Sequence, residues 1–428
     1  MTLAPVRPCA PPTPTPPPTP PPTPTPTRGL VAALGLLALV GAVSGCADAP
    51  PARPPELGPP RKEAAQHQVF SPKVEGTVRE LAERGERALL AQRWREAADV
   101  YEALVGAEPT SKDAPAWLAS LGAAYEGLGE LERARATYRR LVAAFPGDTH
   151  VRGARMREAS LDAYLDDWKA LGELGDTLLA SAASAPPGDG AVDRMLGLGA
   201  RALRTVQTGD DVAALRDVNE GLELMESLHY GASGRLPVPA AELRFALAEV
   251  RRVRSEKIAL QPVTDDFLVK MELRCQGLLD AQSAYADAIR SVDPVWAKMS
   301  GVRVGEMYRT LHRELMAVPP DRAKSESDRN LFYAIMHVRY RALVEKGMEM
   351  MTRTIDFAKK TDDESVWVTR AREAKQQMQS SLDEEKAQLA KLPYTEAEVE
   401  RTLEMMRERA LARAQGKPVP PLKLPRGR

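Results

Sequence analysis

The 428-residue chain is poor in cysteine, histidine and aromatic residues. It has three cysteines, five histidines and only 5% Phe, Trp and Tyr. Cys9 and Cys46 lie near the N-terminus, so Cys275 is the one cysteine in the rest of the chain. A disulfide framework is therefore excluded there. We expect Cys275 to be a small buried side chain within a helix.

Motifs for metal binding and catalysis are missing as well. The histidines have no Cys, His or Asp partner at ligand spacing, which predicts no metal site. They are scattered along the chain: His67, His150, His229, His312 and His337. The sequence has no G-x-S-x-G, P-loop or G-x-G-x-x-G motif. The carboxylate runs at 166–167 and 362–364 are expected near helix starts, where they complement the helix dipole. The sequence predicts no cofactor and no enzymatic activity.

An excess of charge of either sign is also absent. The chain has 59 basic and 59 acidic side chains, so its net charge is zero. Nucleic-acid binders usually carry a clustered basic excess, and nucleic acid is therefore not an expected partner. From about residue 72 onward Ala, Leu, Glu and Arg dominate, and no alternating strand pattern occurs. This composition predicts an all-α protein.

Only one long apolar run is present, at residues 29–43, directly after Arg28. It ends in Val43, Ser44, Gly45 and Cys46. A basic residue, an apolar stretch and a small-residue end are the layout of a bacterial secretory signal. The last four residues resemble a lipobox, the cleavage site of bacterial lipoproteins. The resemblance implies that Cys46 begins the mature chain and carries diacylglycerol, whose two acyl chains hold a protein stably on a membrane.

Three other interpretations compete with the lipoprotein signal. The run has about 17 apolar residues, the lower edge of membrane-spanning length, and could be an uncleaved anchor. It could also be a signal cut at an ordinary small-residue site, or a buried core helix. The Pro/Thr tract at residues 8–27 disfavours the core helix, because such a tract cannot pack a core. As a signal n-region this tract is unusual, which we attribute to a start codon placed upstream of the true signal.

Composition divides the chain into five segments. Residues 1–45 are the leader and signal peptide, and residues 46–70 are the lipidated cysteine and a Pro-rich linker. Helical repeats are predicted over 71–260, with the first helix opening after Ser71 and Pro72. Longer antiparallel helices are predicted over 261–414, and 415–428 is an extended basic tail.

A repeat with an offset of 37 residues follows the linker. Its members are small, aromatic or proline residues: Gly85, Ala97, Tyr101 and Pro109 recur as Gly122, Ala134, Tyr138 and Pro146, and the second copy adds Tyr125. The small residues allow close helix approach, the tyrosines fill the gap to the next repeat, and proline ends the second helix. The pattern resembles the tetratricopeptide repeat, which implies helical hairpins stacked into an α-solenoid.

Weaker signals predict the remaining elements. A degenerate third unit is expected over 151–183, a loop over 184–190 and a fourth repeat-like echo from Ala281 to Tyr308, after which the helices lengthen. The pairs Thr361/Glu364 and Thr395/Glu398 match the capping box that opens a helix.

In related repeats the first helix of each hairpin lines a binding groove. That register selects Arg79, Ala82, Glu86 and Leu89 in the first copy, and Ala116, Ala119, Ala123 and Glu126 in the second. Small side chains in the second set would let a partner backbone approach closely. The alternative is that these alanines pack against the next unit.

Together these features predict a periplasmic scaffold on the outer membrane, held there by lipid and binding other envelope proteins. Ala47 after the cysteine resembles the outer-membrane sorting pattern of enteric lipoproteins. The chain is similar to outer-membrane-protein assembly lipoproteins and to the repeat lipoproteins of myxobacterial gliding-motility complexes. The main alternative is a glycan-binding lipoprotein, although 5% aromatics leaves few platforms for sugars.

Overall fold

A computed structural model describes residues 75–230, 238–290, 293–320, 323, 325–361, 363–421 and 425. These residues form fourteen α-helices and no strand, which confirms the all-α prediction. The leader, Cys46 and the linker, with Ser71 and Pro72, lie outside the described residues. None of the described helices is long and apolar enough to cross a membrane.

The first six helices form three short hairpins. They are 13 to 15 residues long: α1 (Val78–Leu90), α2 (Trp94–Ala107), α3 (Ala114–Gly127), α4 (Leu131–Ala144), α5 (His150–Tyr164) and α6 (Trp168–Ala182). The third hairpin, α5–α6, is the predicted degenerate unit.

The helices from α7 onward are longer, and the longest has 35 residues. They are α7 (Pro187–Gln207), α8 (Asp211–Ser227), α9 (Val238–Glu256), α10 (Phe267–Ile289), α11 (Pro294–Met316), α12 (Glu326–Lys360), α13 (Val366–Lys391) and α14 (Glu396–Ala414). The lengthening therefore begins at α7. The fourth echo falls in the 23-residue helices α10 and α11 instead of in a short hairpin.

The helix starts differ from the sequence prediction at three places. The first described helix begins at Val78 behind a capping box of Thr77 and Glu80, and not directly after Ser71 and Pro72. Part of the predicted loop at 184–190 is helical, because α7 begins at Pro187. Proline is well placed there, since the first turn of a helix needs no N–H donor from it.

The third difference concerns α13. Thr361 ends α12, and Ser365 is the N-cap of α13. Thr361 and Glu364 therefore form no capping box at the start of α13, and Glu364 pairs with Arg372. At α14 the predicted box is confirmed: Thr395 accepts from the Glu398 backbone N–H and Glu398 accepts in return.

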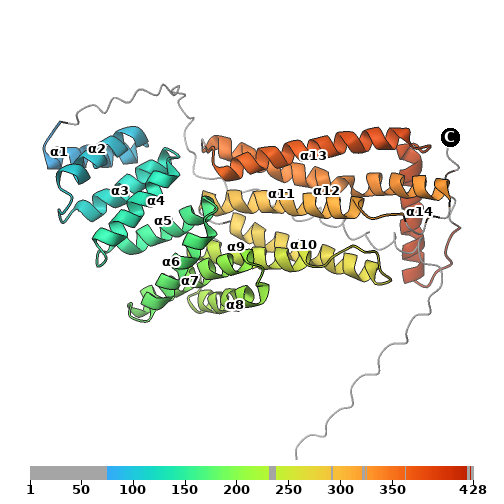
Figure 1. The fold of residues 1–428 in the computed structure, drawn as a ribbon, viewed down its shortest axis with the longest axis horizontal. Helices are drawn as coiled ribbons and strands as arrows, with labels where there is room; N and C mark the ends of the chain where they lie inside the picture. Colours follow the sequence, from blue (N-terminus) through green and yellow to red (C-terminus); the bar gives the residue numbers. More distant parts are fainter. Residues whose placement is uncertain are drawn as a thin grey trace, which may run out of the picture.

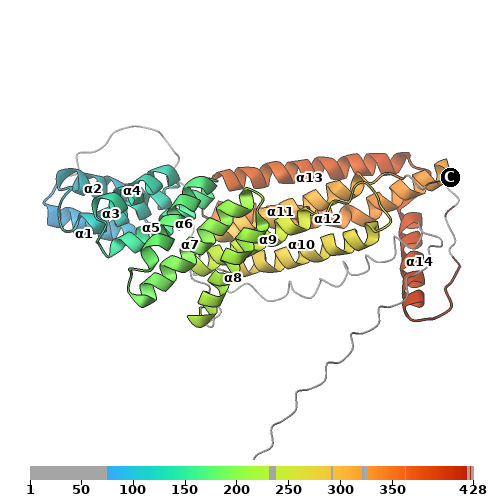
Figure 2. The same ribbon diagram turned by 60° about the horizontal axis from the view of Figure 1, so that its bottom comes forward.

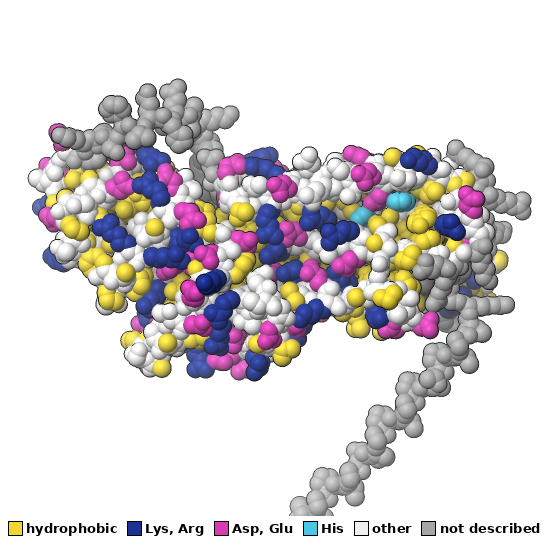
Figure 3. Space-filling model, in the orientation of Figure 1, with side chains coloured by type: hydrophobic (Ala, Val, Ile, Leu, Met, Phe, Trp, Pro, Cys, Tyr) yellow, Lys and Arg dark blue, Asp and Glu magenta, His cyan; other side chains and the backbone are white. Residues whose placement is uncertain are grey.

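The short hairpins occupy one end of an elongated molecule, and α9 to α13 run along its length (Figures 1 and 2). Helix α14 lies crosswise at the opposite end, packed on α12 through Leu331, Ile335, Val399 and Leu403. Acidic and basic side chains are interspersed over the face seen in Figure 3.

Several polar contacts join the short hairpins to the long helices, and those of Tyr164 and Arg157 reach α11 and the segment before α13. At the end of α5, the Tyr164 hydroxyl donates to Asp363, which precedes α13, over 2.5 Å. Lys298 of α11 pairs with the same carboxylate. Two turns earlier on the groove side of α5, Arg157 donates to Asp293, the N-cap of α11, over 3.0 Å. Helix α5 is thus tied to the start of both α11 and α13.

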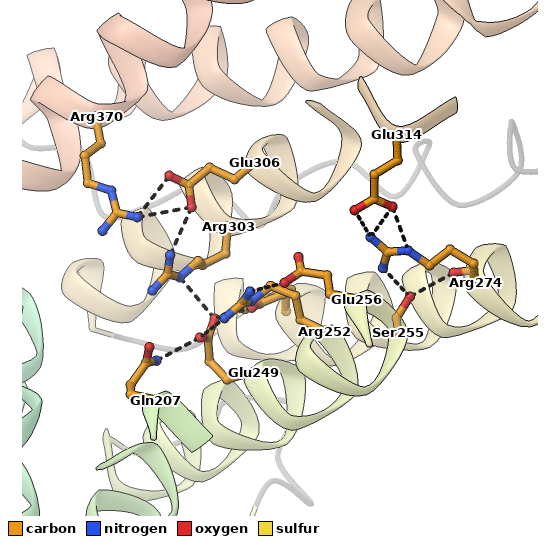
Figure 4. Close-up of polar contacts among 11 residues, drawn as sticks. Gln207, Glu249, Arg252, Ser255, Glu256, Arg274, Arg303, Glu306, Glu314 and Arg370 are labelled. Carbon is orange, nitrogen blue, oxygen red and sulfur yellow. Dashed lines mark hydrogen bonds and ion pairs between the residues drawn. The ribbon is translucent and has the colours of Figure 1, made fainter. Parts of the chain in front are cut away.

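A larger buried network holds the long helices together (Figure 4). Glu249 of α9 is fully buried and pairs with Arg252 at 2.9 Å and Arg303 of α11 at 3.1 Å. It also accepts hydrogen bonds from Gln207 of α7 and Tyr285 of α10. Burial alone would raise the pKa of Glu249, but the two arginines and the Tyr285 hydroxyl bring it down to about 2.

The network continues outward to α13. Arg303 donates to Glu306 over 3.0 Å, and Arg370 of α13 donates to the same carboxylate over 3.0 Å. In the second branch of Figure 4, Arg274 of α10 bridges Ser255 and Glu314. Opposite charges from four helices therefore meet inside the long-helix region.

Glu242 of α9 stands in contrast to Glu249. It is fully buried against Gly199 of α7, and neither of its carboxylate oxygens has a hydrogen-bond partner. Burial raises its pKa well above the usual value. The folded state therefore holds a neutral acid, and its stability falls as the pH rises above about 4.5, where the unfolded chain ionises.

We expect Glu242→Met to stabilise the protein at pH 7 by about 2 kcal/mol or more, because it removes an unpaired polar group of similar length. The gain should be smaller at pH 4.5, where only the cost of burying the neutral, unpaired carboxyl remains. Melting temperatures of both proteins at pH 4.5 and pH 7.5 would test this, since other titrating groups cancel in the difference. An equal shift at both pH values would show that Glu242 is ionised or partnered in the fold.

Candidate functional site

The repeat residues lie inside the hairpins and set how closely their helices pack. Gly85 of α1 faces the ring of Tyr101 on α2, and Gly122 of α3 faces the ring of Tyr138 on α4. A Cβ at Gly122 would stand 2.5 Å from the Tyr138 ring. Each tyrosine ring thus fills the space that a side chain would take at the glycine of its own hairpin. Only the tyrosine hydroxyl points towards the next hairpin.

The other repeat residues take complementary places. Ala97 and Ala134 are fully buried, and Pro109 and Pro146 are exposed two residues beyond the ends of α2 and α4. Tyr125 is buried in α3, and Arg133 lies over its ring at 4.1 Å from the centroid.

A groove of about 590 Å³ lies between α3 and α5, the first helices of the second and third hairpins. Its lining is small and apolar with a polar end: Ala119, Ala123, Glu126, Tyr138, Thr149, His150, Gly153, Ala154, Met156 and Arg157. Because Gly153 has nothing within 4 Å of its missing Cβ, the α5 wall is open there. An extended chain could therefore approach this wall closely.

Three of the four groove residues selected from the second copy line this groove, namely Ala119, Ala123 and Glu126. Ala123 is exposed and Ala119 is half-buried. The fourth, Ala116, lies on the same helix, half-buried and outside the groove lining.

The first-copy positions lie on α1, outside the lining of the α3–α5 groove. Arg79 and Glu86 are exposed, and Arg79 pairs with Glu83 at 3.1 Å. Ala82 and Leu89 pack against the core of the hairpins. The selected positions of α3 therefore line a hollow, while two of the α1 positions are exposed and two pack against the core.

Glu126 is already engaged at the polar end of the groove. It accepts from the Tyr138 hydroxyl over 2.7 Å and pairs with Arg157 of α5. Burial would lower the pKa of Arg157, but the contact with Glu126 raises it, so the guanidinium stays charged. Burial and the nearby Glu126 carboxylate raise the pKa of Tyr138, which keeps its hydroxyl a donor. This end is a fixed hydrogen-bonded wall and not a proton-transfer site.

The sequence reasoning missed the second wall, formed by Gly153, Met156 and Arg157. The 37-residue offset contained the signal: it maps Ala116 to Gly153, Ala119 to Met156 and Ser120 to Arg157. The groove prediction covered the first helices of the first two units only, so the groove-facing positions of α5 were not included.

The histidines in the described part of the chain other than His229 pair with acidic side chains. His150 at the groove edge pairs with Asp148 at 2.8 Å. His312 and His337 flank Glu385 in the long-helix region, at 2.9 and 3.7 Å. Among the described residues no group of three His, Cys, Asp or Glu side chains is arranged to hold a metal ion. Cys275 is half-buried against the core, and burial raises the pKa of its thiol.

Residues 88–157 match the family model described as Tetratricopeptide repeat. The matched segment runs from the end of α1 into α5 and so includes both groove walls. A solved tetratricopeptide repeat protein from Parabacteroides merdae is 13% identical, with a TM-score of 0.36, over 69% of this chain and 98% of its own. No curated protein sequence matches the chain.

The matches indicate no enzymatic family. A tetratricopeptide fold is typical of protein–protein interaction scaffolds, and the chain has that fold in its short hairpins. The α3–α5 groove is accordingly a candidate for contact with another polypeptide.

Proposed function

We propose that the protein is an interaction scaffold that binds a polypeptide segment in the α3–α5 groove. The observation that carries the proposal is the lining: Ala119, Ala123 and Gly153 leave the helix backbones accessible, and Met156 adds an adaptable apolar contact. Grooves with an apolar floor and a few fixed polar groups are typical binding sites. The Glu126–Arg157 pair closes one end and would set the register of the bound segment.

We also propose that the scaffold works from a membrane, in the bacterial envelope. The support is the apolar run before Cys46 and its lipobox-like end. An anchor at Cys46 and a Pro-rich linker to α1 would hold the groove away from the bilayer on the periplasmic face of the outer membrane. Gliding-motility machinery and outer-membrane assembly are the two envelope processes that suit such a scaffold.

The glycan-binding alternative receives less support from the groove. Sugar sites usually use exposed aromatic platforms, and the aromatic residue in this lining is Tyr138, which is buried and packed on Gly122. A polypeptide is the better match to a narrow lining of methyl groups.

The membrane anchor can be tested by Cys46→Ser in cells. We expect loss of acyl labelling and release of the protein from the membrane fraction, because two acyl chains supply the membrane affinity. Retention of the mutant as an uncleaved precursor, with no lipid-dependent change, would contradict the anchor.

The groove can be tested by the double substitution Ala119→Arg and Ala123→Arg. Two long charged side chains should fill the groove and abolish co-purification of its partner proteins after crosslinking in living cells, while the helical circular dichroism signal is unchanged. Ala136→Arg, at an exposed position of α4, is the matched control and should leave partner recovery intact. Full recovery with the folded double mutant would place the binding surface elsewhere.

A further inference from the structure

The basic tail that follows α14 is opposite in net charge to the short hairpins that carry the α3–α5 groove. We infer that the tail, residues 417–428, docks in the α3–α5 groove of a second copy of this chain, linking copies head to tail. The inference rests on the proposed function of the groove and names one segment that it binds.

The tail has the chemistry of a preformed ligand. Its sequence, KPVPPLKLPRGR, carries four basic and no acidic side chains. Gly416, with φ +64°, turns the chain away from α14, and residues 417–421 are exposed. Prolines at 418, 420 and 421 favour an extended polyproline conformation. Such a segment loses little conformational entropy on binding, which is why proline-rich peptides are common ligands.

The short hairpins offer the opposite charge. Residues 75–182 contain nineteen acidic and fourteen basic side chains, so this part of the chain is net negative although the whole chain is neutral. Complementary net charge speeds the encounter and favours the correct partner. Within the groove, methyl and glycine surfaces from Ala119, Ala123 and Gly153 suit the flat apolar rings of proline.

The tail cannot reach the groove of its own chain. Helix α12 has 35 residues and is therefore about 52 Å long. Its first turns pack on α14 through Leu331, while its other end leads to Asp363, which contacts Tyr164 at the end of α5. Twelve extended residues span at most about 43 Å. Helices α3 and α5, which form the groove, lie at the opposite end of the molecule from α14 (Figure 1), so docking has to be between copies.

In a single copy the tail contacts α14, and docking in the groove of a second copy would replace those contacts. Arg409 of α14 donates to the carbonyl of Pro420, and Pro425 lies over the α14 surface near Met405 and Glu404. These contacts are shallow and solvent-exposed. A tail that leaves α14 for the α3–α5 groove would exchange these exposed contacts for the apolar surfaces of Ala119, Ala123 and Gly153.

The test is a titration of a fluorescein-labelled peptide of residues 415–428 with the full-length protein in detergent. We expect saturable binding at low salt that weakens at least about fivefold at 0.3 M salt. Ala119→Arg with Ala123→Arg should weaken it at least about tenfold, and Ala136→Arg should not change it. A matched variant, Ala119→Leu with Ala123→Leu, blocks the groove without adding charge and should also weaken binding.

Two outcomes would overturn the inference: no binding up to ~100 µM protein, or equal binding to the wild type and to both blocked variants. A third such outcome is self-association that depends on protein concentration in sedimentation and does not change when residues 417–428 are deleted. None of these outcomes would contradict the proposed function. That function is contradicted only if partner proteins other than this chain are recovered in full when the groove is blocked. A groove that binds foreign partners but not the tail would refute the inference alone.

Discussion

Glu249→Ala is expected to lower the free energy of unfolding by about 3–5 kcal/mol, the usual cost of removing one member of a buried ion pair. The substitution leaves Arg252 and Arg303 facing each other in the interior, with only Glu256 and Glu306 to balance them. It also leaves the Tyr285 hydroxyl and the Gln207 amide without their shared acceptor. Chemical denaturation followed by circular dichroism would measure the loss.

The matched control is Glu349→Ala, which removes a glutamate from an exposed pair with Arg353 on α12. Exposed pairs contribute little, so the expected change is about 0.5 kcal/mol or less. If both substitutions cost the same, Glu249 is hydrated and the network does not hold α7, α9 and α11 together.

Gly122→Leu is expected to destabilise the short hairpins by about 1–3 kcal/mol or more, because it overpacks a filled space. The Tyr138 ring already occupies the position of the new side chain, and its hydroxyl is held by Glu126 in the groove wall. Moving the ring would cost both the packing and that hydrogen bond. The substitution should therefore also weaken partner binding, which a thermal melt combined with crosslinking would detect.

Gly153→Ala gives the opposite expectation and serves as the control. Gly153 lies within α5 with open space at its Cβ, so alanine should stabilise that helix by up to about 1 kcal/mol. Similar melting temperatures for the Gly122 and Gly153 variants would mean that the 37-residue register does not describe the packing of these hairpins.

Local sequence signals were sufficient for the short hairpins. A glycine, an alanine and a tyrosine at one offset indicated where the two helices of a hairpin approach closely. The Tyr138 ring, however, lies over Gly122 in its own hairpin and, contrary to the prediction from the sequence, does not fill the gap to the next repeat. The capping box of Thr395 and Glu398 could also be predicted, because the two residues are three positions apart in the sequence. These features depend on neighbours in sequence, which a single sequence displays directly.

Contacts between residues that are far apart in the sequence could not be predicted in this way. Thr361 and Glu364 have the spacing of a capping box, yet Glu364 forms an ion pair with Arg372. The adjacent Asp363 pairs with Lys298 and accepts a hydrogen bond from Tyr164. The second groove wall depends on Arg157 reaching both Glu126 and Asp293, residues 31 positions before it and 136 after it. No periodicity marks such pairs, because each is set by how distant helices pack.

Helix α5 contributes both to the groove in the short hairpins and to the contacts with the long helices. Its middle forms a groove wall through Gly153 and Arg157, and its last residue, Tyr164, contacts the region before α13. A segment bound in the groove would therefore lie directly beside the joint between the short hairpins and the long helices. Substitutions at Asp293 are expected to change the groove through Arg157, although Asp293 lies outside its lining.

The most direct test of the account is site-specific photo-crosslinking in living cells, with a photoreactive amino acid at position 123 in the groove or at position 136 on exposed α4. The account predicts discrete crosslinked protein products from position 123, absent from position 136 and lost when Ala119→Arg is added. Equal products from both positions, or none from position 123 in a folded and correctly localised protein, would contradict the claim that this groove binds protein segments.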